Sequence, residues 1–109
     1  RLLRSGLCRQ PAPPAHCRHV YHVYAIELTE RDEVQKSLQA AGIGTGIHYP
    51  VPVHMQKAYA SLGYRRGDLP VTERLADRLL SLPVYAELRP EQVGEVVRQL
   101  EQASLAEAV

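Results

Sequence analysis

Apolar and polar positions alternate from residue 19 onward in the pattern of a β-strand. β-branched and aromatic side chains dominate residues 19–28, and both alternating faces of this segment are largely apolar. A strand with one face in water would carry a polar residue at every second position. The pattern therefore predicts a central strand that is buried on both faces.

A helix is predicted directly after this strand. Thr29 and Asp32 have the spacing of a capping box, in which side chains satisfy the free backbone N–H groups at the start of a helix. The apolar residues that follow share one helical stripe: Val34, Leu38 and Ala41. Gly42 is placed to end the helix, because glycine readily adopts the left-handed backbone found there.

Similar patterns predict the remaining elements. In chain order they are a strand over 43–49, a helix over 55–62 closed by Gly63, a helix over 68–80 with Asp68 as its N-cap and Pro70 in its first turn, a short strand over 81–84, and a helix that starts at Pro90. Together they predict an α+β fold, with a small sheet of about three strands and helices packed on one face.

Composition and charge narrow the class of protein. The 109 residues are 45% hydrophobic and 23% charged, which is typical of one globular domain. A formal net charge of +1 gives no reason to expect nucleic acid or an anionic membrane as a partner. No apolar run approaches the roughly 20 residues of a membrane span. Because nothing resembles a secretory leader and the two cysteines form no framework, we expect a cytoplasmic protein.

The first eighteen residues differ from the rest of the chain. Residues 1–18 contain four arginines and no acidic residue, and three of the four positions in 11–14 are proline. Such a proline-rich stretch favours an extended, solvated backbone over a helix. We therefore predict an irregular leader or linker over 1–18 and a folded domain over 19–109.

Several groups of residues invite a functional interpretation that their spacing does not support. The histidines and cysteines of residues 8–22 include no Cys-x-x-Cys pair, and an extended chain points His19 and His22 to opposite faces, so a zinc site is not predicted. The glycines of residues 42–46 follow a helix and precede a strand, the reverse of a phosphate-binding loop. Lys57 has no sign of the desolvated pocket that a Schiff-base lysine needs. We expect no metal ligand, cofactor-binding residue or catalytic residue in this chain.

His48 and Tyr49 are the candidate substrate-binding residues. They stand at the end of a predicted strand, just before Pro50 and Pro52, and rigid turns at strand ends often present polar groups to ligands. A core tyrosine beside a capping histidine would give the same pattern, and the residues alone leave both interpretations open. Strand alternation sends the two side chains to opposite faces, so both can bind one ligand only if the strand end is twisted or bulged.

Short motifs occur in a specific order between residues 19 and 100. They are HVYHVY at 19–24, AGIGTGIHYPVPVH at 41–54, LGY at 62–64, GDLP at 67–70 and LSLP at 80–83. In order and spacing they resemble the C-terminal domain of the nucleotide-sugar aminotransferases of the DegT/DnrJ/StrS type. Residues 1–18 are not covered by the resemblance.

The resemblance implies that this chain is a fragment of a larger enzyme. Members of that family are fold-type I pyridoxal-phosphate enzymes, usually dimers, that move an amino group from a donor such as glutamate to a keto-sugar nucleotide, in the biosynthesis of polysaccharide or antibiotic sugars. Their N-terminal domain carries the Schiff-base lysine and most cofactor contacts, so this chain alone is expected to be inactive. The resemblance also implies that His48 and Tyr49 contact the sugar nucleotide. The alternative is a stand-alone ligand-binding or regulatory α+β module without catalysis.

Overall fold

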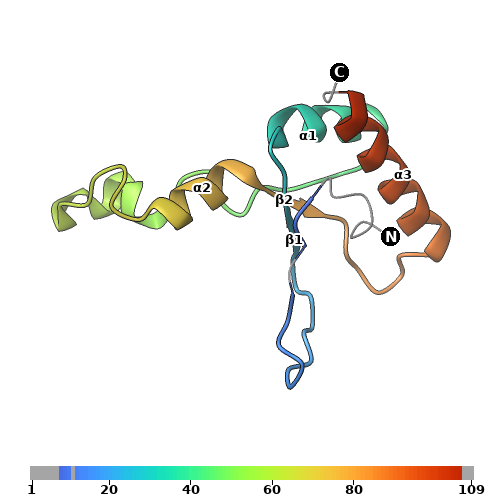
Figure 1. Cartoon of the computed structure of the whole chain (residues 1–109), viewed down its shortest axis with the longest axis horizontal. Coiled ribbons are helices and arrows are strands. Elements are labelled where there is room, and N and C mark those ends of the chain that lie inside the picture. The colour runs from blue at the N-terminus through green and yellow to red at the C-terminus, as the bar shows by residue number, and fades with distance from the viewer. Residues whose placement is uncertain (1–7, 11, 107–109) are drawn as a thin grey trace.

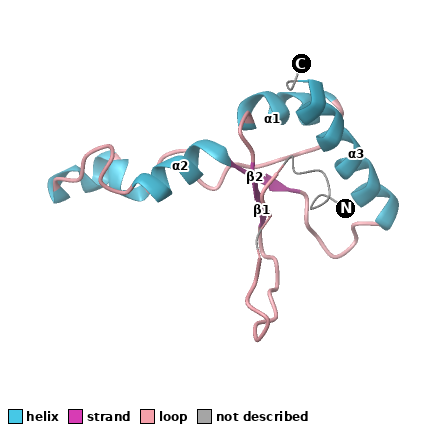
Figure 2. Cartoon of the chain, in the orientation of Figure 1, coloured by secondary structure: helices cyan, strands magenta, loops and turns pink. Residues whose placement is uncertain are grey.

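The computed structural model describes residues 8–10 and 12–106. Its elements in chain order are β1 (Tyr24–Glu27), α1 (Arg31–Ala40), η2 (Val53–Met55), η3 (Lys57–Leu62), α2 (Pro70–Arg78), β2 (Leu79–Leu82) and α3 (Pro90–Ala106). The predicted α+β class is confirmed. α1 and α3 pack together beside the strands, whereas α2 and the two short 3₁₀ helices extend away from them (Figures 1 and 2).

The sheet consists of two antiparallel strands, β1 and β2, where about three strands were predicted. Single bridges extend this layer on either side, from Arg9 to Glu27 on β1 and from Gly46 to Ser81 on β2. β1 therefore has backbone partners along both edges, which agrees with its apolar pattern. Arg9 belongs to the stretch that was predicted to be an irregular leader.

The strand predicted over 43–49 forms only the bridge at Gly46. Glycine weakens a strand interior, and β2 offers just four residues between the end of α2 and Pro83, so there is little strand to pair with. The first strand is also shorter than predicted, starting at Tyr24. Tyr21 has a φ of 48°, which no β-strand accommodates.

The core lies where α1 and α3 meet the two strands. Its buried apolar side chains are Ile26, Leu28, Val34, Leu38, Ile43, Leu80, Leu82, Leu100 and Ala103. Ile26, Leu38 and Leu80 have no exposed surface. The helical stripe at Val34 and Leu38 therefore faces the core as predicted, and burial of these side chains is the main contribution to stability.

The helix ends predicted from glycine and proline are confirmed, whereas the predicted polar caps do not form. Gly42 and Gly63 have φ values of 76° and 78° and follow α1 and η3 as predicted, and α2 begins at Pro70. The predicted capping box at Thr29 does not form, because Glu30 precedes α1 and no side chain caps it. Asp68 does not cap α2 either; its Oδ2 accepts a hydrogen bond from the Arg65 N–H at 2.8 Å.

Residues 49–78, here called the arm, project from the core (Figure 1). The helix predicted over 55–62 is present as η2 and η3, both 3₁₀ helices. The radius of gyration is 15.6 Å, compared with about 13 Å for a compact domain of 100 residues. The chain is thus more extended than a single globule.

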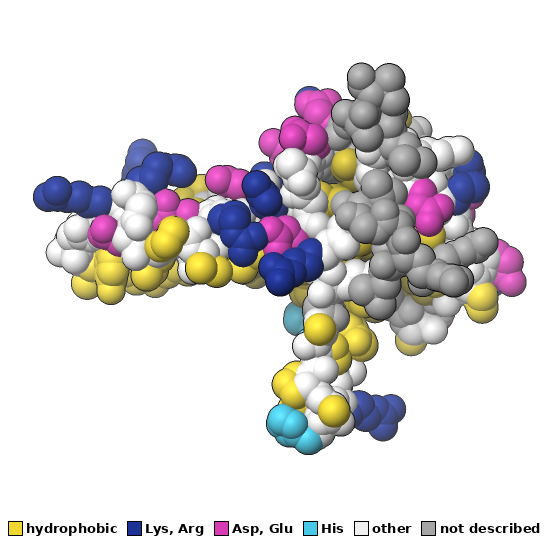
Figure 3. Space-filling model, viewed as in Figure 1, with side chains coloured by type: hydrophobic (Ala, Val, Ile, Leu, Met, Phe, Trp, Pro, Cys, Tyr) yellow, Lys and Arg dark blue, Asp and Glu magenta, His cyan; other side chains and the backbone are white. Residues whose placement is uncertain are grey.

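Large apolar side chains line the surface of the arm. Those that are exposed are Tyr49, Val51, Val53, Tyr59, Leu62, Tyr64, Leu69 and Val71. Many apolar side chains gather along one edge of the arm in the space-filling view (Figure 3). Contiguous apolar surface of this kind is typical of an interaction site. None of the helices in the described part of the chain has the length and apolar character needed to cross a membrane.

Candidate functional site

A hollow of about 770 Å³ opens beside the strands, where the end of β2 meets the segment that leads into the arm. His48 and Tyr49 both line it, together with His22, Gly46 and Ser81. Three separate parts of the sequence therefore form its wall. The two candidate residues are brought to one cavity, although strand alternation alone would have separated them.

The backbone at His48 and Tyr49 is not a regular strand. Their peptide bond is cis, and their rings meet edge to face with centroids 5.4 Å apart. Tyr49 is 72% exposed, so the structure does not bury it as a core tyrosine. Its phenol group is accessible to a ligand in the hollow.

Two residues hold the imidazole of His48. The Nδ1 atom of His48 lies 2.8 Å from the Oγ atom of Ser81, which is a hydrogen-bond distance. A Cβ atom added to Gly46 would lie 2.7 Å from the Cε1 atom of His48, closer than real Cβ contacts. The imidazole thus lies against a glycine and is hydrogen-bonded to a serine.

Sequence reasoning missed Ser81 and His22 as parts of this site. Ser81 is the only polar residue of β2 and is just 6% exposed. A polar side chain at a buried strand position usually has a hydrogen-bonding role, and this signal was available in the sequence. His22 was considered only as a metal ligand. It lines the hollow because the chain turns before β1 instead of continuing as a strand.

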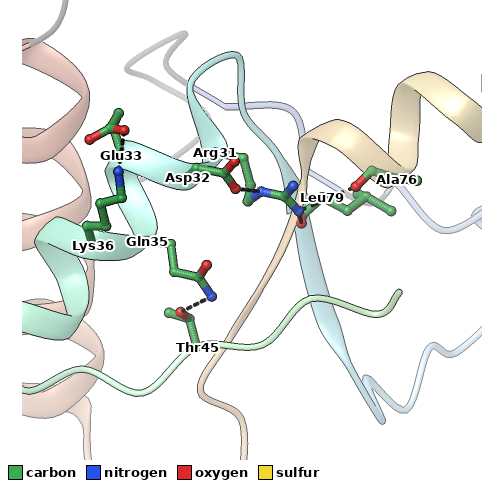
Figure 4. A network of polar contacts seen from close by, with 8 residues as sticks. All are labelled: Arg31, Asp32, Glu33, Gln35, Lys36, Thr45, Ala76 and Leu79. Atoms are coloured by element: carbon green, nitrogen blue, oxygen red, sulfur yellow. Dashed lines mark hydrogen bonds and ion pairs between the residues drawn. The ribbon is translucent and has the colours of Figure 1, made fainter. Parts of the chain in front are cut away.

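A buried arginine ties α1 to the start of β2 (Figure 4). The NH1 group of Arg31 donates hydrogen bonds to the carbonyl oxygens of Ala76 and Leu79, both at 3.3 Å, and its Nε donates to Asp32. These carbonyls stand at the C-terminal end of α2, where helix carbonyls lack partners within the helix. Arg31 therefore fixes the junction from which β2 and Ser81 follow.

A second polar contact joins α1 to the segment before His48. The side-chain amide of Gln35 donates a hydrogen bond to the Thr45 Oγ1 atom at 3.4 Å (Figure 4). The next residue, Gly46, exchanges two backbone hydrogen bonds with Ser81, at 2.7 and 3.0 Å. The backbone that leads to His48 is thus held from α1 and from β2.

The arm contains a buried polar pair of its own. The Nε2 atom of His54 lies 3.1 Å from Oε1 of Glu73, and both side chains are at least nine-tenths buried. Glu73 also accepts hydrogen bonds from the backbone N–H groups of Gly67 and Leu69. The Gly67 N–H is the main cause that lowers the pKa of Glu73 below its usual value, and the contacts with His54 and Leu69 add to it. The pair closes the 65–69 loop onto α2.

Neither lysine of the chain fits a covalent pyridoxal-phosphate site. Lys36 forms an exposed ion pair with Glu33, and Lys57 is exposed on η3. A Schiff-base lysine needs a desolvated pocket, and neither lysine lines the hollow. Within the described residues, no group of three or more His, Cys, Asp or Glu side chains is arranged to hold a metal ion.

The sequence of residues 4–101 matches the family model of the DegT/DnrJ/EryC1/StrS aminotransferase family. The chain belongs to this family, which confirms the resemblance seen in its motifs. The matched range also includes most of residues 1–18. Pyridoxal phosphate is the cofactor that this family implies.

The curated relatives that the chain matches are much longer than the chain itself. A "pleiotropic regulatory protein" of Geobacillus stearothermophilus is 46% identical over 82 residues, which are 75% of this chain and 22% of the relative. A "UDP-N-acetyl-3-dehydro-alpha-D-glucosamine 3-aminotransferase" of Acidithiobacillus ferrooxidans is 44% identical over 86 residues, with coverages of 79% and 23%. The crystal structure of S. venezuelae DesV in complex with a ketimine intermediate matches with a TM-score of 0.87 and 34% identity, covering 94% of this chain and 29% of that one. The chain thus spans less than a quarter of the length of these two curated relatives.

Proposed function

We propose that this chain is the C-terminal, substrate-recognition part of a pyridoxal-phosphate-dependent sugar aminotransferase. The whole enzyme would transfer an amino group from an amino acid such as glutamate to a keto-sugar linked to a nucleotide, and would act as a homodimer. Residues 19–109 would form the small domain, with 1–18 as the leader or linker before it. Family membership and the names of the sugar aminotransferase relatives support this proposal.

The observation that carries the proposal is that His48 and Tyr49 share one open hollow. An imidazole and a phenol can each donate a hydrogen bond to an oxygen of a diphosphate or a sugar. Neither group has to transfer a proton to do so. Their proposed role is therefore to bind and orient the sugar nucleotide.

The chemistry of amino transfer would come from segments outside this chain. Pyridoxal phosphate supplies an electron sink and a carrier for the amino group. Because Lys36 and Lys57 do not fit its covalent site, we assign cofactor binding to the rest of the enzyme, mainly to an N-terminal domain. The hollow would then face that domain and hold the sugar nucleotide near the cofactor.

The proposal is tested by comparing the 109-residue chain with the full-length protein. With pyridoxal phosphate, glutamate and a keto-sugar nucleotide, the full-length protein should form 2-oxoglutarate, and the isolated chain should form none. The isolated chain should also show no lysine-linked cofactor absorbance. A cofactor band in the isolated chain that disappears on Lys57→Ala would contradict the assignment.

The name of one relative, a pleiotropic regulatory protein, favours a regulatory role as the second candidate function. The alternative proposal is then a stand-alone regulatory or ligand-binding module without catalysis. The mass of the natural protein separates the two proposals. A native protein close to the 12.2 kDa of this chain would favour the module. A protein several times larger, with a lysine-bearing domain upstream, would favour the enzyme.

A further inference from the structure

Ser81 is a polar residue in a position that would otherwise suit an apolar one. Its neighbours in β2 are leucines, and it is 6% exposed. Burying a hydroxyl group is unfavourable unless it finds a hydrogen-bond partner. Its side-chain partner is the Nδ1 atom of His48, 2.8 Å away, and its backbone pairs with Gly46. One residue of β2 therefore holds both the imidazole and the backbone two residues before it.

A side chain at position 46 would compete for the space that the His48 imidazole fills. The φ angle of Gly46 lies outside the left-handed region, so its backbone is open to other residues. A Cβ atom at this position would lie 2.7 Å from Cε1 and 3.5 Å from both ring nitrogens of His48. A side chain here would push the imidazole away from Ser81.

We propose that Ser81 and Gly46 are positioning residues that hold the His48 imidazole with its Nε2 atom directed to an anionic oxygen of the nucleotide-linked sugar. This inference rests on the proposed function, because it takes the ligand class from there. Ser81 acts through His48 and does not itself need to contact the ligand.

In the proposed arrangement the Ser81 hydroxyl is the donor of this hydrogen bond and the Nδ1 atom of His48 is the acceptor. When the Ser81 hydroxyl donates to Nδ1, the single proton of a neutral imidazole resides on Nε2. Among the described residues, the bond to Ser81 is the one side-chain hydrogen bond that His48 forms. Nε2–H is therefore the donor left for a ligand, and the diphosphate of a sugar nucleotide offers acceptor oxygens. Positioning of this kind lowers the cost of binding, because the donor is already oriented.

The test compares Ser81→Ala with Ser81→Thr in the full-length protein. UDP and dTDP serve as probes, and their dissociation constants are measured by calorimetry. Loss of the hydroxyl in Ser81→Ala should weaken binding of the preferred nucleotide by about 2–10-fold, the effect of one hydrogen bond. Ser81→Thr keeps the hydroxyl and should restore most of the affinity.

Gly46→Ala gives an independent perturbation of the same imidazole. It should weaken nucleotide binding at least as much as Ser81→Ala does, because the new Cβ displaces the ring. Gly94→Ala is the matched control: Gly94 lies on α3, and an added Cβ meets no atom within 4 Å. This variant should bind the nucleotide as the parent does.

Histidine ¹⁵N chemical shifts report the imidazole directly, with the His48 signal assigned by its loss in His48→Gln. The parent should show the Nε2–H form, and Ser81→Ala should show a mixture of both neutral forms. Unchanged shifts and unchanged nucleotide affinity in Ser81→Ala would overturn the inference. If the parent binds neither UDP nor dTDP, the proposed function fails, and with it the ligand assigned to His48, whatever the ¹⁵N shifts show.

Discussion

Replacing Arg31 with methionine should destabilise the fold through the junction between α2 and β2. Arg31 is buried, and its guanidinium donates to the carbonyl oxygens of Ala76 and Leu79. Methionine preserves most of the apolar stem, so the loss comes mainly from these hydrogen bonds. Both carbonyls would then lack their charged donor. The ion pair with Asp32 adds little, because the Asp32 carboxylate is 69% exposed.

The structure sets the size of the effect. A hydrogen bond from a charged donor contributes about 1.5–3 kcal/mol, and less when it is long. At 3.3 Å both bonds are long, so together they should contribute about 2–3 kcal/mol to the free energy of unfolding. For a domain of this size, that corresponds to a decrease in Tm of roughly 10 °C or more.

Urea denaturation of the 109-residue chain, followed by circular dichroism at low protein concentration, measures this loss. Lys36→Met is the matched control, since Lys36 lies on the same helix and its ion pair with Glu33 is exposed. That change should leave the free energy of unfolding close to that of the parent, because an exposed ion pair contributes little. Equal midpoints and slopes for Arg31→Met and Lys36→Met would refute the role assigned to the Arg31 hydrogen bonds.

Two further predictions concern the arm. Because the Gly67 N–H lowers the pKa of Glu73, the contribution of this carboxylate to arm stability is complete above pH 4.5 and is lost as the pH falls through the lowered pKa. The Gly67 amide chemical shift should therefore be constant above pH 4.5 and change in more acidic solution. A Gly67 amide shift that stays constant over the whole pH range would contradict this prediction. The exposed apolar side chains of the arm should also make the isolated chain self-associate, and Leu62→Asp should reduce the association in sedimentation experiments. A monodisperse parent chain with a concentration-independent Tm would count against that expectation.

Local patterns were sufficient for much of the fold. Gly42, Gly63 and Pro70 mark helix ends through their own backbone preferences, so their roles could be predicted from the sequence. The Val34 and Leu38 stripe faces the core for a similar reason, since helical spacing places both side chains on one face. The predicted strand over 43–49 failed because strand formation depends on a partner. Its partner, β2, is four residues long and pairs with it only at Gly46.

The candidate site could be predicted only in part. His48 and Tyr49 were found from their place before two prolines and from a family resemblance. The contact between His48 and Ser81 joins residues 33 positions apart, and no local pattern specifies such a distance. The polar residue within an apolar strand was a signal that Ser81 needs a partner, but the partner becomes visible only when β2 and Gly46 are paired. The shared hollow depends on the same pairing.

The central claim is that His48 and Tyr49 bind the sugar nucleotide. Calorimetric titration of the full-length protein with UDP-N-acetylglucosamine and dTDP-glucose tests it most directly. His48→Ala and Tyr49→Phe should each weaken binding of the preferred sugar nucleotide by about 0.5–3 kcal/mol, the range for one lost hydrogen bond. The half-reaction with glutamate should stay close to that of the parent. Parental affinity in both variants would show that the pair is structural and would contradict the account.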